Sequence, residues 1–160
     1  MQFEELQSLI ERNFPDAIIG ENQDSTPKAL RVDATNLLEV CHFLHTHEKT
    51  YFDSLSCLTG LDNGAEAGSM EVIYNLYSIP YDLHLSIWVE LDREKPEIES
   101  VSSIWGGANW HEREAFDLLG IEFKNHPDLR RILLPDDWQG YPLRKDYEEQ
   151  ETYHEIKVKY

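Results

Sequence analysis

Three stretches of the sequence alternate between apolar and polar side chains over lengths typical of extended strands. They are residues 51–61, 70–79 and 83–91. In the last two the alternating apolar set is Met70, Val72, Tyr74, Leu76, Leu83, Leu85, Ile87, Val89 and Leu91. Successive side chains of a strand point to opposite faces, so a period of two gives each strand one apolar face. Turn-forming residues at 62–64 and 80–82 separate the stretches. We predict an antiparallel meander of three long strands with one buried face.

Apolar residues at helical spacing predict two helices that would cover this face. The first spans residues 2–13, and the second spans residues 36–46 with Thr35 as its expected N-cap. Strands at 17–20 and 29–32 should form a hairpin between these helices. The predicted fold class is therefore α+β, an antiparallel sheet covered on one face by helices, with an extended irregular C-terminal arm.

The stretch that follows Gly120 is rich in prolines and turn formers, which argue against regular structure. We assign residues 1–120 to the α+β domain and residues 121–160 to an extended C-terminal docking arm. Because the proline-rich path has few local contacts, we predict that residues 120–160 are disordered in the free chain.

The charge of the chain excludes several classes of partner. The net charge is −17, and residues 1–100 hold 6 Lys and Arg against 19 Asp and Glu. Such an acidic surface is unsuited to nucleic acid or anionic lipid, since both require basic patches. No apolar run approaches the ~20 residues that span a bilayer, so we expect no direct membrane insertion. Cys41 and Cys57 lie in apolar patterns and are expected to be buried free thiols in a reducing compartment.

The helix expected at residues 110–119 carries charged and apolar side chains on both of its faces. Arg113 and Asp117 share one half of the cylinder with Trp110, and Glu112 lies among apolar residues of the other half. An unpaired buried charge is costly, so such a helix is most easily satisfied if both faces are covered and its charges have fixed partners. We interpret the segment as a docking surface before an active site.

The ends of this helix carry their own signals. Asn109 is the expected N-cap, with Glu112 three positions later in capping-box register. Gly120 is the expected residue that ends the helix.

Three carboxylates of the helix could serve in acid–base catalysis: Glu112, Glu114 and Asp117. Structural pairing is the stronger interpretation. Arg113 and Asp117 are one helical turn apart, and Arg130 and Arg131 can fold back onto the helix or reach a partner.

Metal and cofactor motifs are weak in this chain. His42 and His45 are three residues apart and could share a metal, but no further ligand at suitable spacing completes a site. The pair His111-Glu112 is not followed by a second histidine one turn later, because position 115 is Ala. We find no nucleotide-binding loop, nucleophile motif, or ligand set for iron–sulfur, haem or flavin.

One segment nevertheless has a specific pattern. It consists of Glu112-Arg113-Glu114, then Asp117 with two apolar residues, then His126, then Arg130-Arg131. Residues 112–131 thus resemble the signature of the C subunit of respiratory complex I, the proton-pumping NADH:quinone oxidoreductase. The following ILLPDDWQGYPLRKDY (132–147) resembles the C-terminal arm of that family.

The resemblance implies a non-catalytic subunit of the peripheral arm that binds no cofactor itself. Iron–sulfur clusters, FMN and quinone would belong to partner subunits. In the family this subunit packs against the D subunit, which holds the quinone site, with the B and I subunits nearby, on the cytoplasmic side of the inner or plasma membrane. The implied interface residues are Glu112, Arg113, Glu114, Asp117, His126, Arg130, Arg131, Leu143, Arg144, Asp146 and Tyr147.

Two alternatives remain open at this level. The chain could be the equivalent subunit of a membrane-bound hydrogenase, or of a dehydrogenase fed by another donor. It could also be a stand-alone acidic hydrolase that uses Glu112, Glu114 or Asp117.

Overall fold

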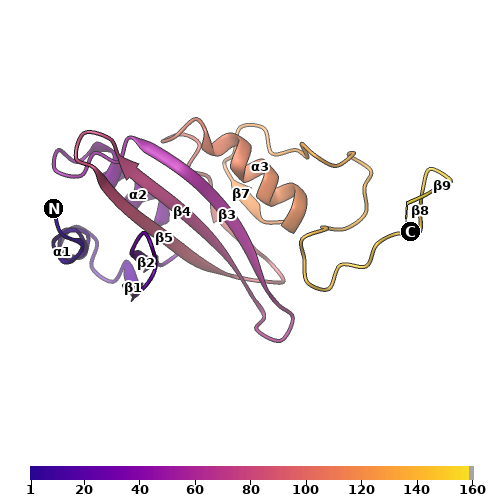
Figure 1. The fold of residues 1–160 in the computed structure, drawn as a ribbon, viewed down its shortest axis with the longest axis horizontal. Helices are drawn as coiled ribbons and strands as arrows, with labels where there is room; N and C mark the ends of the chain where they lie inside the picture. The colour runs from indigo at the N-terminus through magenta and orange to yellow at the C-terminus, as the bar shows by residue number, and fades with distance from the viewer. Residues whose placement is uncertain (159–160) are drawn as a thin grey trace.

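A five-stranded sheet forms the centre of the molecule (Figure 1). The computed structural model describes residues 1–158. The strands of this sheet are β1 (Ile18–Asn22), β2 (Ala29–Val32), β3 (Ser54–Gly64), β4 (Ser69–Ser78) and β5 (Leu83–Asp92), in the spatial order β1-β2-β5-β4-β3. The α+β class predicted from the sequence is confirmed.

The three long strands form the predicted antiparallel meander. Tyr74 of β4 lies opposite Leu58 of β3 on one side and Ile87 of β5 on the other. The alternating apolar residues of β4 and β5 are buried, apart from the half-buried Leu83. This face of the sheet is therefore the one that the sequence pattern indicated.

Strand β3 differs from the prediction in where it begins and in which of its side chains face the core. It starts at Ser54, because the chain is still turning at Tyr51, whose φ is +35°. A bulge lies between Leu55 and Cys57, which changes the alternation downstream. As a result Leu58 faces the core, whereas the sequence pattern followed the odd-numbered positions.

The sheet is mixed, which corrects the expectation of an antiparallel sheet. Strands β1 and β2 form the predicted antiparallel hairpin, but β2 pairs with β5 in parallel. A parallel pair requires a crossover between its strands. Here the crossover consists of a helix and the β3–β4 hairpin, so β2 joins the edge of the meander that β3 leaves free.

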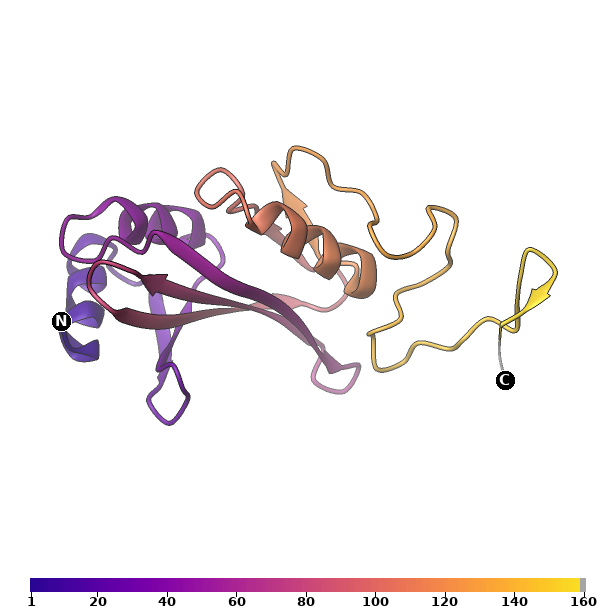
Figure 2. The same ribbon diagram turned by 45° about the horizontal axis from the view of Figure 1, so that its top comes forward.

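The helices α1 (Phe3–Asn13), α2 (Leu37–Thr46) and α3 (Ala108–Leu119) lie on one side of the sheet (Figure 2). Leu6 and Ile10 of α1 are buried in the same hydrophobic core as Leu44 of α2 and Leu119 of α3. Burying one apolar face of a sheet under helices is the arrangement that the alternation requires. None of the helices within residues 1–158 is long and apolar enough to cross a membrane.

Two predicted helix caps are wrong. Helix α2 begins at Leu37 after Asn36, and the Thr35 hydroxyl donates to the Asp33 carboxylate. Helix α3 begins at Ala108 after Gly107, so Asn109 lies inside the helix. Gly120 ends α3 in the left-handed conformation, with φ of +76°, as the sequence predicted.

The chain after α3 first returns to the body and then becomes irregular. Strand β7 (Glu122–Lys124) pairs in parallel with β6 (Glu97–Glu99), and Phe123 is buried in the core. The first residues of the stretch assigned to the arm therefore pack as part of the body. Beyond them the chain runs away from the sheet to a small hairpin, β8 (Thr152–Tyr153) and β9 (Ile156–Lys157) (Figure 1).

Gly60 allows α3 to pack closely on β3. A Cβ atom at this position would lie 2.6 Å from Leu119 Cδ1 and 2.9 Å from Ile121 Cδ1. Both side chains are buried, so neither has free space to move into. The missing side chain of Gly60 therefore sets the distance between the helix and the sheet.

We predict that Gly60→Ala lowers the free energy of unfolding by about 1–3 kcal/mol, because the added methyl group overpacks this contact. Urea denaturation followed by circular dichroism would measure the change. Gly106→Ala is the matched control, since its Cβ would meet no atom within 4 Å. Equal stability of the two variants would contradict the close packing.

Candidate functional site

The Asp117 carboxylate joins helix α3 to the C-terminal arm. Its Oδ2 accepts hydrogen bonds from the backbone N–H groups of three consecutive residues, at 3.1, 2.7 and 3.0 Å. These residues are Ile132, Leu133 and Leu134. Its Oδ1 accepts a hydrogen bond from Arg131 Nη1 at 3.0 Å. We refer to this set as the Asp117 contact.

The environment of Asp117 favours its ionised form. The side chain is fully buried, and burial alone would raise its pKa. The three backbone donors and the Arg131 guanidinium outweigh burial and hold the pKa below its ordinary value. Asp117 is thus a buried charge that finds four hydrogen-bond donors within residues 1–158 of its own chain.

Arg131 supports the same segment from the other side. Its Nη2 donates to the carbonyl oxygens of Trp138 and Gly140, at 3.2 and 3.1 Å. The guanidinium also lies 5.3 Å from the centre of the Tyr141 ring. The sequence prediction that Arg131 can fold back onto the helix is confirmed, although the predicted ion pair of Asp117 with Arg113 is replaced by one with Arg131.

Glu112 connects α3 to the segment that precedes it. Its Oε2 accepts from the Ser100 hydroxyl at 2.6 Å and its Oε1 from the Val101 N–H at 2.7 Å. These bonds occupy the carboxylate, which explains why the predicted capping box does not form. Burial raises the pKa of Glu112 to about 7, and the two hydrogen bonds oppose that shift only in part. His126 Nε2 lies 3.7 Å from Oε2 and 3.1 Å from the Asn109 carbonyl oxygen.

Arg113 is buried beneath the start of the arm. Its Nε and Nη2 donate to the carbonyl oxygens of Arg130 and Arg131 at 3.1 and 3.4 Å. Its guanidinium lies 5.1 Å from the centre of the Trp110 ring. Arg113 therefore satisfies carbonyl groups of the arm and supports an exposed aromatic side chain.

A second contact fastens residues 145–146 of the arm to the end of strand β3. Asp62 accepts from Arg93 Nε at 2.7 Å and from the Lys145 N–H at 2.8 Å, and Arg93 also pairs with Asp146 at 2.6 Å. The Arg93 guanidinium is the largest cause that holds the pKa of Asp62 well below its usual range. We refer to this set as the Asp62 contact. From the sequence, Asp62 was predicted only as part of a turn, because its partners lie 31 and 83 positions away.

Between the two contacts the arm packs on the end of α3. Arg144 Nε donates to the Leu119 carbonyl oxygen at 2.7 Å, and the Leu143 N–H donates to that of Leu118 at 3.0 Å. The Tyr141 ring lies against Gly120, where a Cβ atom would be only 2.6 Å away. The orphan carbonyl groups at the end of the helix are thus satisfied by the arm.

The structure divides the predicted interface residues into two groups. The buried or half-buried group is Glu112, Arg113, Asp117, His126, Arg131, Arg144 and Tyr147. The exposed group is Glu114, Arg130, Leu143 and Asp146. Within residues 1–158 Glu112, Arg113 and Asp117 have hydrogen-bond partners in this chain, and the subunit interface stays a prediction.

Exposed apolar side chains on α3 and the arm were missed by the sequence analysis. Trp110 is 63% exposed, Leu133 is 64% exposed and Leu143 is 59% exposed. The helical pattern placed Trp110 on the same half of the helix as Arg113 and Asp117, and in the structure its ring lies outward over Arg113. We define the α3–arm surface as Trp110, Glu114, Leu133 and Leu143.

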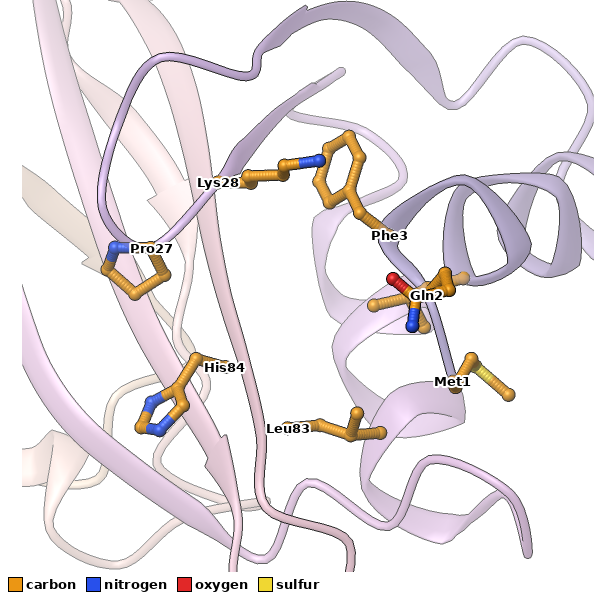
Figure 3. Close-up of a pocket in the computed structure, with 8 residues that line it drawn as sticks. Met1, Gln2, Phe3, Pro27, Lys28, Leu83 and His84 are labelled. Carbon is orange, nitrogen blue, oxygen red and sulfur yellow. The ribbon is translucent and has the colours of Figure 1, made fainter.

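The hollow beside the start of α1 is lined mostly by apolar side chains. It has a volume of about 150 Å³ and lies where the start of α1 meets β5 (Figure 3). Its Lys28 is already engaged by Glu4 at 3.3 Å and by the Phe3 ring. Within residues 1–158 no group of three or more His, Cys, Asp or Glu side chains is arranged to hold a metal. Cys41 is buried, but Cys57 is half-exposed, which corrects the prediction for that thiol.

Comparison with known proteins decides the family. The family described as "Respiratory-chain NADH dehydrogenase, 30 Kd subunit" matches residues 30–153. The chain belongs to this family. It is 41% identical over 154 residues to the C subunit of the NADH-quinone oxidoreductase of Chlorobium phaeobacteroides, covering 95% of this chain and 92% of that protein. It is 43% identical to the corresponding subunit of Chloroherpeton thalassium, where the match covers 95% of this chain but 63% of that protein. The resemblance to the C subunit of complex I is thereby confirmed.

Two solved structures share the fold. One is Nqo5 in a trypsin-resistant fragment (1–134), with a TM-score of 0.62 at 24% identity, covering 78% of this chain and 98% of the fragment. The other belongs to the membrane-bound sulfane sulfur reductase, an archaeal respiratory membrane complex, with a TM-score of 0.72 at 23% identity, covering 91% of this chain and 85% of that one. At these identities the likeness concerns the fold alone.

We predict that Asp117→Asn releases the start of the arm from α3, because an amide cannot accept from Arg131 and three N–H groups at once. The free energy of unfolding should fall by about 2–4 kcal/mol, and trypsin should cleave faster after Arg130 and Arg131. Asp128→Asn is the control, since it removes only a surface pair with Arg130. Equal trypsin cleavage of the two variants would show that the Asp117 contact does not hold the arm.

We predict that Glu112 makes the folded chain less stable as the pH rises. Its folded pKa of about 7 lies above the ordinary 4.5, so the neutral form favours folding. That preference is fully present below about pH 4.5 and is lost as the pH rises through about 7, at a cost of about 3 kcal/mol.

Glu112→Gln should flatten this part of the stability profile, measured by urea denaturation across the pH range. The control is Glu114→Gln, an exposed neighbour on the same helix that leaves His126 and Glu112 unchanged. A Glu112→Gln variant with the same pH dependence as the control would contradict the assignment.

Proposed function

We propose that this chain is a non-catalytic docking subunit of the peripheral arm of a proton-translocating NADH:quinone oxidoreductase. It holds the D subunit, which carries the quinone site, in place, with the B and I subunits nearby, on the cytoplasmic side of the membrane. The complex passes electrons from NADH to quinone through FMN and iron–sulfur clusters, which the partner subunits bind. Membership of the family carries the first part of this proposal.

One observation supports docking over chemistry. The buried charged side chains of α3 form hydrogen bonds within the chain itself, whereas the side chains of Trp110, Leu133 and Leu143 project outward. Large exposed apolar side chains on a rigid support are typical of protein interfaces, where aromatic residues contribute much of the binding energy. Trp110 rests on Arg113, which is itself held by the arm. The surface is therefore pre-organised for a partner.

The hydrolase alternative is disfavoured by the same geometry. Glu112 and Asp117 are both fully buried, so neither can reach a substrate. Glu114 is exposed, but the carboxylates of Glu112 and Asp117, which would act with it in acid–base catalysis, face into the chain.

The equivalent subunit of a related complex remains the second candidate. The fold likeness to the chain from the sulfane sulfur reductase complex favours this candidate as much as the Nqo5 likeness favours the first. The partners separate the two candidates, because a nickel-site large subunit would indicate a hydrogenase.

The test is affinity purification of the tagged chain from its own membranes in mild detergent. Mass spectrometry of the bound proteins and an NADH:quinone assay on the eluate are the two readouts. We expect iron–sulfur and quinone-site subunits together with NADH-driven activity. A chain that purifies alone would refute the proposal.

The double variant Trp110→Ala, Leu133→Ala should then reduce co-purification of partners by ~10-fold or more, because such residues dominate interface energies. Its own fold should persist, since both side chains are largely exposed. Ile79→Ala is the matched control, as Ile79 is 62% exposed and directly follows β4. Equal recovery of partners with both variants would place the interface elsewhere.

A further inference from the structure

Strand β3 is an edge strand with an open hydrogen-bonding side. It pairs with β4, and no other backbone hydrogen bond involves residues 54–61 anywhere in residues 1–158. In an antiparallel strand about half of the N–H and C=O groups point away from the partner strand. Those of β3 therefore form an unpaired row along the edge.

Between its two bulges, at Leu55/Cys57 and Asp62/Gly64, this edge lacks the charges and prolines that usually protect a free strand. Residues 54–61 read SLSCLTGL, without a charge or a proline, in a chain of net charge −17. The opposite edge strand, β1, has 5 residues and includes Glu21, whereas β3 has 11 residues and its acidic residue, Asp62, comes only after residues 54–61. Natural proteins keep free edges short, charged or interrupted by proline, so a long neutral edge indicates one that is covered in the assembly.

A groove runs beside the open edge. It has a volume of about 260 Å³ and lies between β3 and α3, which neighbour each other in both ribbon views (Figures 1 and 2). Its apolar walls include Leu118, Leu119 and Leu143. Glu114 is the acidic residue of its rim, so the groove offers apolar contacts and one negative charge.

We propose that an extended segment of another subunit of the complex adds to the edge of β3 as a further strand. Its backbone pairs with residues 54–61, its alternate apolar side chains enter the groove, and a basic side chain faces Glu114. The net charge of −17 disfavours a second copy of this chain as the occupant, because two such chains repel each other. This inference rests on the proposed function, since it assumes that the chain works within a complex.

Hydrogen exchange tests the pairing in the affinity-purified complex and in the free chain. We expect about half of the amides in residues 54–61 to exchange fast in the free chain and ~100-fold slower in the complex. A partner that covered the surface by side chains alone would leave these amides unprotected.

The native Cys57 identifies the occupant. It lines the groove and is half-exposed, whereas Cys41 is fully buried and stays silent. A thiol–amine cross-linker added to the complex should join Cys57 to an extended segment of another subunit. Glu114→Lys should lower recovery of that subunit by ~10-fold, and Glu66→Lys in the β3–β4 turn should not.

The outcomes separate this inference from the proposed function. Protected β3 amides with a cross-link to another subunit support it. Unprotected amides in a complex that contains its partners, or a cross-link to a second copy, would overturn it and leave the docking function intact. Purification of the chain without partners would refute the docking function, and this inference with it.

Discussion

A buried carboxylate must be given partners, and in this chain Asp117 obtains them by ordering the segment that follows. The hydrogen bonds to Oδ2 come from three consecutive backbone N–H groups, so the arm must bend around the end of α3 to supply them. Arg131 then completes the charge pairing and reaches back to two carbonyl groups of the arm. The position of Trp110 follows from the same arrangement, because Arg113 beneath it is held by carbonyl groups of the bent segment.

The regular elements of the fold were predictable from local patterns. The alternation of β4 and β5, the helical stripes and Gly120 are properties of neighbouring residues, and the structure confirms each of them. The parallel pairing of β2 with β5 could not be predicted in this way, since it depends on which edge of the meander is left free. The inward face of β3 was missed because a single bulge reverses the alternation.

The candidate site was predictable only in part, for a related reason. The sequence showed that α3 carries charges among apolar residues and that these charges need fixed partners. It did not show that the partners are backbone groups. Residues of almost every type carry a backbone N–H, so the sequence does not mark which of them donate. Asp62 was missed entirely, since its partners lie far away in the chain. The exposure of Trp110 was also hidden, because helical spacing alone does not distinguish the core from an interface.

The two contacts of the arm reinforce each other through chain length. Arg131 of the Asp117 contact and Lys145 of the Asp62 contact are 14 positions apart. Once either contact forms, the other closes a short loop, so its groups meet at the high effective concentration set by the linker. Breaking one contact lowers the effective concentration at which the groups of the other contact meet. The segment between them therefore attaches to the body and detaches from it as a unit. A partner that displaced only one end of this segment would thus loosen all of it, including the Leu143 side of the α3–arm surface.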